Sequence, residues 1–442
     1  MKSFIQTLKN IWKIEDLKSR ILFTLGILAI YRLCAYVTLP GIDPAQLQAL
    51  KSQTSGGIMS ILDMFSGGAF SNASIVALGI MPYISASIVV QLLGIAIPFF
   101  QKMQREGESG RRKINQITRY LTVFILILQA PTYLVNLHAQ LPQSAFLLQG
   151  TTFTVVCTII LISGTMFVMW LGERITDKGL GNGISLIIMV GIIARLPMSL
   201  VQEVAMRLEN QGGGLVAFLV EIVIWLVVIA INILLVQGVR KIPVQYAKRI
   251  VGNKQYGGVR QYIPLKVNAA GVMPIIFAQA LMMVPVTLAG FASSNSMSGF
   301  VTAFSDITGF WYNFVNAILI VLFTYFYTAV TINPTQMAED MKRNGGFIPG
   351  VKPGKKTVEY LDSIMSRITL PGSLFLAFVA VLPAFAKILG ISYQFSQFFG
   401  GTTLLIMVGV VLDTLQQIES HLLMRHYDGL MKSGRIKGRS GT

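Results

Sequence analysis

Apolar stretches of about 20 residues recur along this chain, and they constrain its fold more than any other feature. A helix of about that length is needed to cross the hydrocarbon core of a bilayer. Because these stretches do not alternate apolar and polar residues, they favour a helical bundle over a β-barrel. We count ten candidate spans, roughly at residues 19–39, 74–97, 117–137, 151–172, 183–203, 215–237, 268–290, 312–332, 368–389 and 401–417.

The composition agrees with an all-α polytopic membrane protein. Of the 442 residues, 53% are hydrophobic and only 12% are charged, which is unlike a soluble domain. The first apolar stretch, 21–39, is too long for a cleavable signal peptide, and it follows a basic amphipathic segment. Cys34 and Cys157 both lie within apolar stretches, so no disulfide framework is expected.

A short segment rich in small residues, GGIMSILDMFSGGAFSNAS, begins at Gly56 and precedes the second span. It is too short to cross a bilayer, too apolar for an ordinary loop, and interrupted by Gly67 and Gly68. Its final Ser and Asn residues can cap a new helix. This pattern is typical of a broken membrane helix, which is tolerated only where its backbone lines a cavity or is buried in protein. We therefore expect the chain to enclose a cavity.

Basic residues give the expected orientation. An even number of spans puts both termini on one side, and the loops on that side carry most of the Lys and Arg behind the net charge of +17. The positive-inside rule therefore predicts cytoplasmic termini. Two cytoplasmic loops, about 238–267 and 333–367, are longer than topology requires. They suggest a docking surface for an acidic protein or for RNA phosphates, with topology alone as the alternative explanation of their charge.

The motifs that could indicate enzymatic chemistry lack the spacing or the structural context that such chemistry needs. The glycine-rich DKGLGNGIS follows no strand, and in GVKPGKKT only three residues separate Gly350 from Gly354 where a phosphate loop needs four. Both stretches are better explained as tight turns. The three histidines lack metal-binding spacing, and Ser163 and Ser185 have no intramembrane histidine to act as a base. We expect no enzymatic activity, cofactor or metal.

Two kinds of residue within the spans leave alternatives open. Ionisable groups near span ends suit either anchoring at the interface or a coupling-ion site, and they are Arg32, Glu221, Lys387 and Asp413. Isoleucines near the middle of several spans suit either ordinary packing or a functional constriction. Ile80 and Ile84, like Ile184 and Ile188, are four residues apart and so share a helix face. A coupling-ion site would make the chain a secondary transporter of a small solute.

Six long motifs resemble the SecY family of bacterial protein-conducting channel subunits. They occur in the family's order along essentially the whole chain: GIMPYISASIVVQLL (79–93), EGESGRRKINQ (106–116), WLGERITDKGLGNGISLI (170–187), PLKVNAAGVMPIIFA (264–278), FYTAVTINPTQMAEDMKRNGGFIPGVKPGKKT (326–357) and GGTTLLIMV (400–408). Motifs of this length are highly specific.

The resemblance implies two inverted five-helix halves, 1–210 and 211–442, around an hourglass pore with a plug at about 58–72. A ring of apolar side chains would narrow the pore: Ile80, Ile84, Ile184, Ile188, Ile276 and Ile406. The centre of the plug would comprise Met64, Phe65, Ser66, Gly67, Gly68, Ala69 and Phe70. Polar residues at a lateral gate would be Ser85, Gln91, Thr122, Asn268 and Gln279, which hydrogen-bond either across the gate or within their own helices.

The resemblance also implies function and partners. Such a channel passes unfolded secretory polypeptides across the bacterial inner membrane and releases transmembrane segments sideways into the bilayer. Energy would come from the SecA motor ATPase or a translating ribosome, with SecE and SecG as membrane subunits and signal peptides as ligands. The docking residues would be Arg240, Lys241, Lys248, Arg249, Lys254, Lys342, Arg343, Lys352, Lys355 and Lys356. Lys352 occupies a position where the family usually has Arg, which could weaken or reshape that contact.

Overall fold

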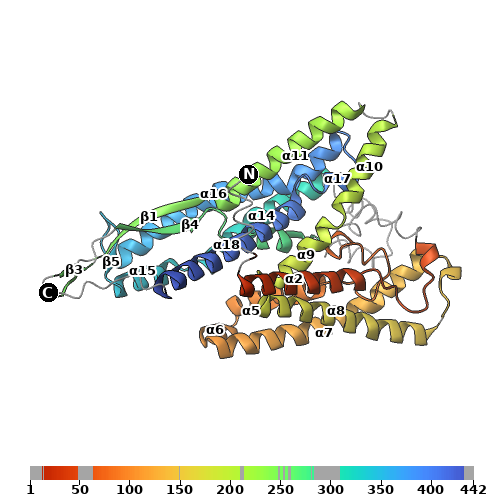
Figure 1. Ribbon diagram of the computed structural model, residues 1–442, viewed down its shortest axis with the longest axis horizontal. Coiled ribbons are helices and arrows are strands. Elements are labelled where there is room, and N and C mark those ends of the chain that lie inside the picture. The colour runs from red at the N-terminus through yellow and green to blue at the C-terminus, as the bar shows by residue number, and fades with distance from the viewer. Residues whose placement is uncertain are drawn as a thin grey trace. The chain divides into compact units, whose positions relative to one another are not determined.

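The computed structural model describes residues 12, 14–47, 63–148, 150–209, 214–246, 249–251, 254–256, 260–279, 281–282 and 309–432. The chain divides into two compact units. Unit 1 consists of residues 1–198 and 409–442, and unit 2 of residues 199–408. Figure 1 labels the elements of both units.

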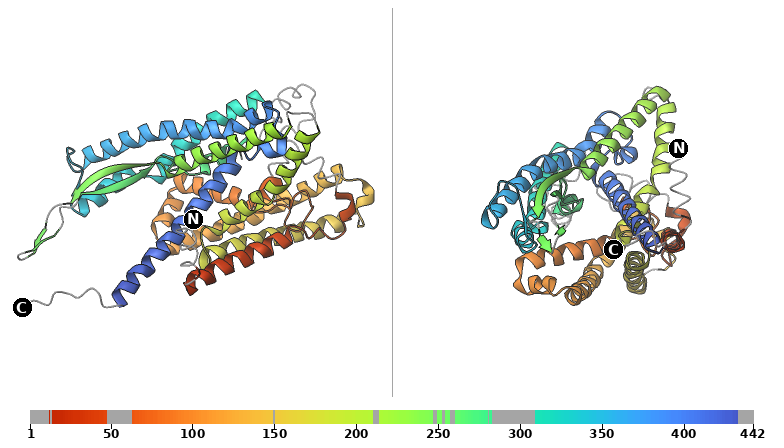
Figure 2. Two further views of the ribbon diagram at one scale, coloured as in Figure 1. Left: turned by 45° about the horizontal axis from the view of Figure 1, so that its top comes forward. Right: turned by 60° about the vertical axis from the view of Figure 1, so that its left-hand side comes forward.

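Unit 1 is built from long helices. In chain order they are α2 (Glu15–Cys34), α5 (Met81–Ala96), α6 (Pro98–Arg105), α7 (Glu108–Gln140), α8 (Thr151–Lys178), α9 (Gly183–Ile193), the start of α10 (Leu196–Leu208) and the end of α18 (Gly401–Lys432), with single turns η1 (Pro44–Gln46) and η2 (Gln143–Ala145). Helix α7 packs between α5 and α8, and α2 packs on α8 and α9. Figure 2 shows α2, α7 and α8 running side by side.

Glycines of α8 and α9 let two other segments reach the backbone of α8. A Cβ atom at Gly164 would lie 2.0 Å from the carbonyl oxygen of Ile75. At the crossing with α9, a Cβ atom at Gly183 would lie 1.9 Å from the carbonyl oxygen of Gly172. No side chain fits at either contact, so α8 fixes both the segment before α5 and the first turn of α9. A buried cluster completes this core: Leu39, Ile42, Leu47, Phe70, Ala73, Ala77, Ala130, Tyr133, Leu134, Leu137, Leu141, Ala145, Phe146, Phe153, Cys157 and Leu161.

Unit 2 combines membrane helices with a small sheet. Its elements are α11 (Gly214–Gln237), β1 (Val239–Tyr246), β2 (Arg249–Val251), β3 (Lys254–Tyr256), β4 (Arg260–Lys266), α14 (Phe310–Thr331), α15 (Pro334–Arg343), β5 (Gly346–Phe347), α16 (Lys355–Ile388) and α17 (Tyr393–Ser396). Residues 273–279 are also helical. Helix α16 packs along α14, and their core includes Ile275, Ala278, Ile320, Leu376, Ala377, Val379 and Leu405.

The two long basic loops fold together into one module, which we call the basic module (residues 239–266 and 333–367). Strand β1 pairs antiparallel with β4, with Ile242 opposite Ile263, and with β5 on its other edge. Alternate residues of a strand face the same side, so Ile242 and Val244 both reach a core formed with α15 and α16. The buried members of that core are Ile242, Val244, Leu265, Ala338, Met341, Ile348, Leu361 and Met365. The sequence predicted structured loops here but no strands.

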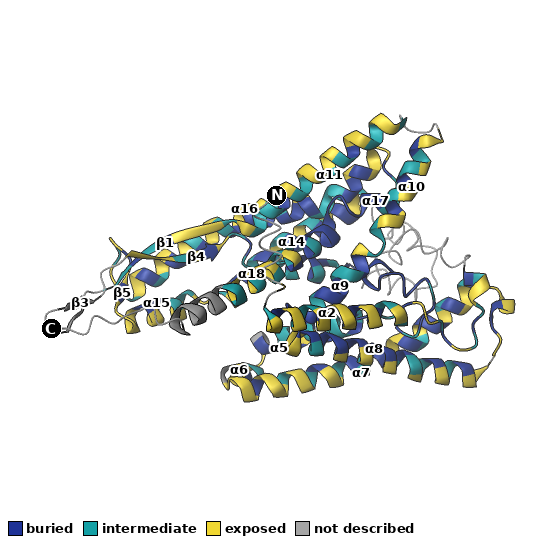
Figure 3. Ribbon diagram, viewed as in Figure 1, coloured by how far each residue is buried: buried dark blue, intermediate teal, exposed yellow. Residues whose placement is uncertain are grey.

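Seven of the ten predicted spans correspond to helices that are long and apolar enough to cross a membrane, and the span 74–97 corresponds to the bent pair α5 and α6. Among the described residues, seven helices are long and apolar enough, or up to eight if α5 and α6, bent by 103°, form one broken span. Helix α2 does not qualify, because even its most apolar window includes Lys18, Arg20 and Arg32. The predicted span 268–290 lies partly outside the described residues. Figure 3 shows wide exposed surfaces on α11, whose apolar window is only 11% buried, as expected for a helix facing lipid.

Candidate pore ring, plug and docking surface

The four candidate ring residues of unit 1 lie at the starts of α5 and α9. The amide of Ile84 donates to the carbonyl oxygen of Ile80 over 3.1 Å, so these two residues share a helix face, as their spacing predicted. The Asn182 side chain caps α9 by accepting from the amide of Ile184 over 3.2 Å. Ile80 is 2% exposed and Ile188 is 5% exposed, while Ile84 and Ile184 are half-buried.

The two candidate ring residues of unit 2 lie on neighbouring elements. Ile276 is in the helix 273–279 and Ile406 is near the start of α18. The Nε2 atom of Gln279 donates to Oγ1 of Thr402 over 3.2 Å, which ties these two elements together. Ile406 is buried and Ile276 is half-buried. All six isoleucines are therefore buried or half-buried, unlike the exposed residues that face lipid.

The structure describes the predicted plug from residue 63 onward, and it is buried there except at Asn72, which is half-buried. Residues 64–70 are all buried, and two neighbouring helices bind their backbone. From α2, the Tyr31 hydroxyl donates to the carbonyl oxygen of Ser66 over 3.1 Å, and Nη1 of Arg32 donates to that of Gly67 over 2.8 Å. From α7, the Tyr133 hydroxyl donates to the carbonyl oxygen of Phe70 over 3.0 Å. Residues 58–62 of the predicted plug lie outside the described residues.

One ion pair in the plug was not predicted from the sequence. Asp63 is 1% exposed, and its carboxylate pairs with the guanidinium of Arg195, in the turn between α9 and α10. The other carboxylate oxygen accepts from the amide of Ser71 over 2.8 Å. Burial raises the pKa of Asp63, and Arg195 and the hydrogen bonds from Ser71 only partly oppose this. A signal was present, since both charges interrupt apolar stretches where an unpaired charge would be costly.

The predicted gate residues of unit 1 bond within their own helices. Ser85 Oγ donates to the carbonyl oxygen of Met81 over 3.1 Å, and Thr122 Oγ1 to that of Thr118 over 2.7 Å. Gln91 Nε2 donates to Ser87 Oγ over 3.4 Å. In unit 2, Asn268 is 9% exposed, and Gln279 binds Thr402 as described above. The contacts of Ser85, Gln91 and Thr122 match the alternative of hydrogen bonds within their own helices, whereas Gln279 bonds to a residue of α18.

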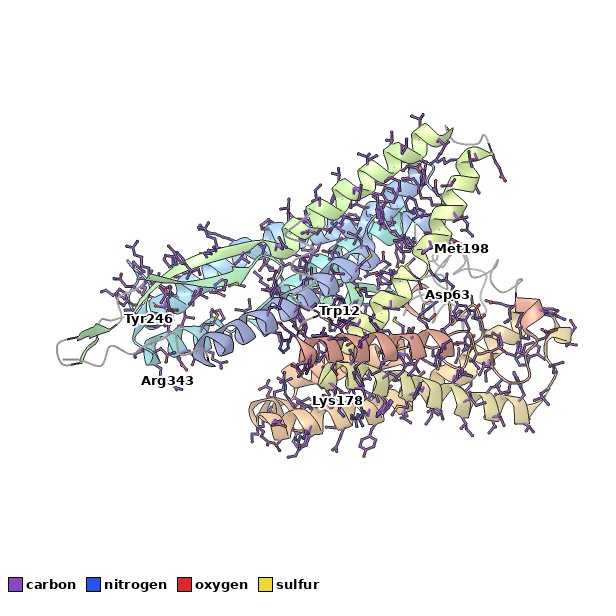
Figure 4. All side chains as sticks on the ribbon, viewed as in Figure 1. Trp12, Asp63, Lys178, Met198, Tyr246 and Arg343 are labelled. Carbon is purple, nitrogen blue, oxygen red and sulfur yellow. The ribbon has the colours of Figure 1, made fainter. Side chains whose placement is uncertain are left out.

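The basic module presents most of the predicted docking residues to solvent. Arg240, Lys241, Lys342, Arg343, Lys352, Lys355 and Lys356 are all exposed. Among the described residues, only Lys356 of these seven has an ion-pair partner, Glu359 at 3.4 Å. Lys248 lies outside the described residues, and Arg249 and Lys254 are described only by their backbone. Figure 4 labels Arg343 and Tyr246 on this module.

Lys352 is held in a fixed turn. Gly350 and Gly354 have φ angles of +85° and +102°, which favour glycine, and Thr357 Oγ1 donates to the carbonyl oxygen of Lys352 over 3.0 Å. The prediction of a tight turn for this glycine-rich stretch is confirmed. The turn presents Lys352 at the surface with its backbone constrained.

A buried ion cluster in unit 2 accounts for one ionisable residue that the sequence left open. Arg207, in α10, pairs with Glu203 on the same helix, where Nε and Oε1 are 3.2 Å apart, and with Glu221 of α11. It also donates to the carbonyl oxygen of Gly390 over 3.0 Å, while Glu203 accepts from the amide of Ser392 over 2.9 Å. Glu221 therefore helps to join α10, α11 and the turn after α16.

Known proteins resemble this chain over most of its length. The SecY family profile matches residues 74–415. The protein translocase subunit SecY of Mycobacterium tuberculosis H37Rv is 43% identical, covering 98% of this chain and 100% of that protein. The same-named subunit of Vibrio cholerae is 39% identical, covering 96% of each.

Solved structures share the fold. One described as a protein conducting channel has a TM-score of 0.61 at 17% identity, covering 91% of each chain. A channel from a canine ribosome-channel complex has a TM-score of 0.53 at 16% identity, also covering 91% of each. The predicted all-α membrane fold is confirmed, and the chain belongs to the SecY family.

Proposed function

We propose that this chain is a channel subunit that translocates unfolded secretory polypeptides and releases transmembrane segments laterally into the plasma membrane. Its relatives in M. tuberculosis and V. cholerae are named protein translocase subunits. The observation that carries the proposal is the buried plug of residues 64–70, seated on α2, α7 and α9 ahead of the first pair of candidate ring isoleucines. Such a segment is suited to closing a resting pore.

The isoleucines suit a ring through which a polypeptide passes. Conduction requires contacts weak enough for every side chain to leave, and isoleucine offers no hydrogen-bond donor or acceptor. Its β-branch restricts χ1, which keeps the ring stiff. A narrow apolar constriction also excludes water, so it resists ions while the plug is seated.

We propose that the halves 1–210 and 211–442 surround this pore. A lateral gate would lie between helices that start near Ser74 and residue 117 in one half and near Asn268 and Tyr312 in the other. An apolar segment in the pore gains free energy by moving into lipid. Interhelical hydrogen bonds in membranes are worth about 1 kcal/mol or less, so polar residues at the gate would not lock it.

The basic module would be the docking surface for the energy source. Six exposed Lys and Arg side chains there have no ion pair within the described residues, which suits an acidic surface of SecA or the phosphates of a ribosome. SecE and SecG would be its membrane partners. Both termini would then lie in the cytoplasm, and the chain would lie in the inner membrane. The channel itself would perform no covalent chemistry and need no cofactor.

A small-solute transporter is the weaker candidate. It needs ionisable groups available to bind a coupling ion within the membrane. Glu221 is instead paired with Arg207, and no cluster of metal-ligating side chains occurs among the residues that the structure describes.

The decisive experiment is to cross-link a stalled secretory chain to the proposed ring. Photoreactive probes at positions 80, 188, 276 and 406 should each cross-link to the middle of the stalled chain. Position 127, an exposed isoleucine of α7 that is 52% exposed, is the matched control and should not react. Equal reaction at position 127, or none at the ring positions, would contradict the proposed path.

A further inference from the structure

The two partners of the plug ion pair differ in their access to water. The side chain of Asp63 is 2% exposed, whereas that of Arg195 is 30% exposed. If the pair separated, Arg195 could be hydrated where it stands. Asp63 could reach water only if the plug moved, and an unpaired buried carboxylate is strongly unfavourable.

The surroundings hold the arginine over the plug. Its Nη2 atom donates to Ser71 Oγ over 3.1 Å as well as pairing with Asp63. Gly68, with φ of +90°, leaves room for the guanidinium, since a Cβ atom there would lie 3.3 Å from Nη2. Arg195 therefore contacts both Asp63 and Ser71, the two residues whose hydrogen bond closes the turn 63–71.

Arg195 also lies at a break in the chain's architecture. Residues 194–195 form the non-helical turn between α9 and α10, and unit 1 ends three residues later at Met198. Figure 4 labels Asp63 and Met198, which both belong to unit 1. A displacement of α10 relative to α9 would be absorbed at this turn and would carry the guanidinium with it.

We propose that the Asp63–Arg195 pair is a charge latch for the plug. The plug stays seated while Arg195 neutralises the buried carboxylate, and a movement of α10 that withdraws Arg195 expels Asp63, and the plug with it, into water. The cost of burying an unpaired carboxylate thus favours opening, and the ion pair with Arg195 removes that cost. This inference rests on the proposed function, because it takes the segment 64–70 to be a plug.

The latch predicts an asymmetric pair of mutants. Arg195→Gln leaves a buried unpaired charge and should unseat the plug. Asp63→Asn removes that charge while keeping an oxygen for the Ser71 amide, so it should have little effect. It should also suppress Arg195→Gln, because the double variant has no buried charge to expel. A mere loss of packing would instead make the double variant at least as loose as Arg195→Gln.

The test is amide hydrogen exchange in the full chain in lipid nanodiscs, measured over residues 67–73. Arg195→Gln should speed exchange by about tenfold or more, and the double variant should return to within about threefold of wild type. Arg195→Lys, which keeps the charge, should also stay close to wild type. Arg32→Gln is the matched control, since it removes a guanidinium that binds a neutral carbonyl, and Asp63→Asn should not suppress it.

Unchanged exchange in Arg195→Gln, or a double variant as fast as Arg195→Gln alone, would overturn the latch. So would a general loosening of α7 and α8 in Arg195→Gln that Asp63→Asn does not reverse. Ion conductance of the same variants separates this result from the proposed function. If exchange follows the predicted pattern while conductance never changes, the latch stands and the pore assignment fails.

Discussion

Gly67 of the plug approaches Gly191 of α9 so closely that Gly67 cannot carry a side chain, and at Gly191 a Cβ atom would lie only 3.1 Å from the carbonyl oxygen of Phe65. A Cβ atom at Gly67 would lie 2.7 Å from the Cα atom of Gly191 and 2.7 Å from Nη1 of Arg32. The φ angle of Gly67 is +66°, in the left-handed region. This pair of glycines is what allows the plug turn to lie directly against α9.

We predict that Gly67→Ala unseats the plug. The left-handed conformation costs a non-glycine residue about 1–2 kcal/mol, and the clash with α9 backbone adds to this. Gly107→Ala is the control, because Gly107 has a similar φ of +71° but nothing within 4 Å of a Cβ atom. Proteolysis of the plug segment in proteoliposomes should rise for Gly67→Ala only. Equal sensitivity of both variants would show that backbone strain alone matters.

A second prediction concerns the ring. Ile80→Gly combined with Ile276→Gly should raise the resting ion conductance in planar bilayers by about tenfold or more, because a wider, less apolar constriction stays wet. Ile127→Gly with Ile318→Gly is the control, as these isoleucines are exposed and lose the same atoms from helices. A resting conductance equal to wild type in the ring variant would count against the ring.

The sequence predicts local features well and distant pairings poorly. The four-residue spacing of Ile80 and Ile84 predicted a shared face, because helix periodicity depends only on neighbouring residues. Asp63 and Arg195 are 132 residues apart, and their pairing depends on how α9 packs against the plug, which no local pattern encodes. The strand β1 was also missed, because its two buried residues, Ile242 and Val244, gain a core from distant parts of the sequence, including β4, α15 and α16.

A third prediction addresses docking at Lys352. Lys352→Glu should lower motor-driven export into vesicles roughly threefold to tenfold, since reversing a charge at an interface rim slows association. Lys352→Arg should not lower export, because it keeps the charge and adds a bidentate fork. Assembly should be intact in both, as Lys352 is exposed and only its backbone is bound. Unchanged export with Lys352→Glu, even at low salt, would remove this turn from the docking surface.

The buried cluster of Glu203, Arg207 and Glu221 gives a fourth prediction. Arg207→Met should destabilise the protein by about 3–5 kcal/mol, because it leaves two buried carboxylates uncompensated. Adding Glu203→Gln and Glu221→Gln should recover much of this loss by removing both charges. Thermal unfolding in detergent measures the effect. If the triple variant were no more stable than Arg207→Met, the cluster would act through packing and not through charge.

The pH dependence of the plug follows from the raised pKa of Asp63. A displaced Asp63 in water titrates near its ordinary value of 3.8, whereas burial makes the seated carboxyl bind its proton at higher pH. Protonation therefore stabilises the seated plug as the pH falls through the raised pKa of Asp63. This stabilisation is complete below pH 3.8, and it is lost as the pH rises through the raised pKa. The other ionisable groups that contact the plug are Arg32, Arg195, Tyr31 and Tyr133.

The effect should be largest when the arginine is absent. Arg195 lowers the pKa of Asp63, so Arg195→Gln should raise that pKa further and move the transition to higher pH. We predict that acidification reseats the plug in Arg195→Gln, slowing exchange at residues 67–73 after correction for the intrinsic pH dependence of exchange. The Asp63→Asn, Arg195→Gln variant has no carboxyl to protonate there and should show no such transition. A transition of equal size in both variants would mean that a group other than Asp63 titrates, because the double variant has no carboxyl at position 63.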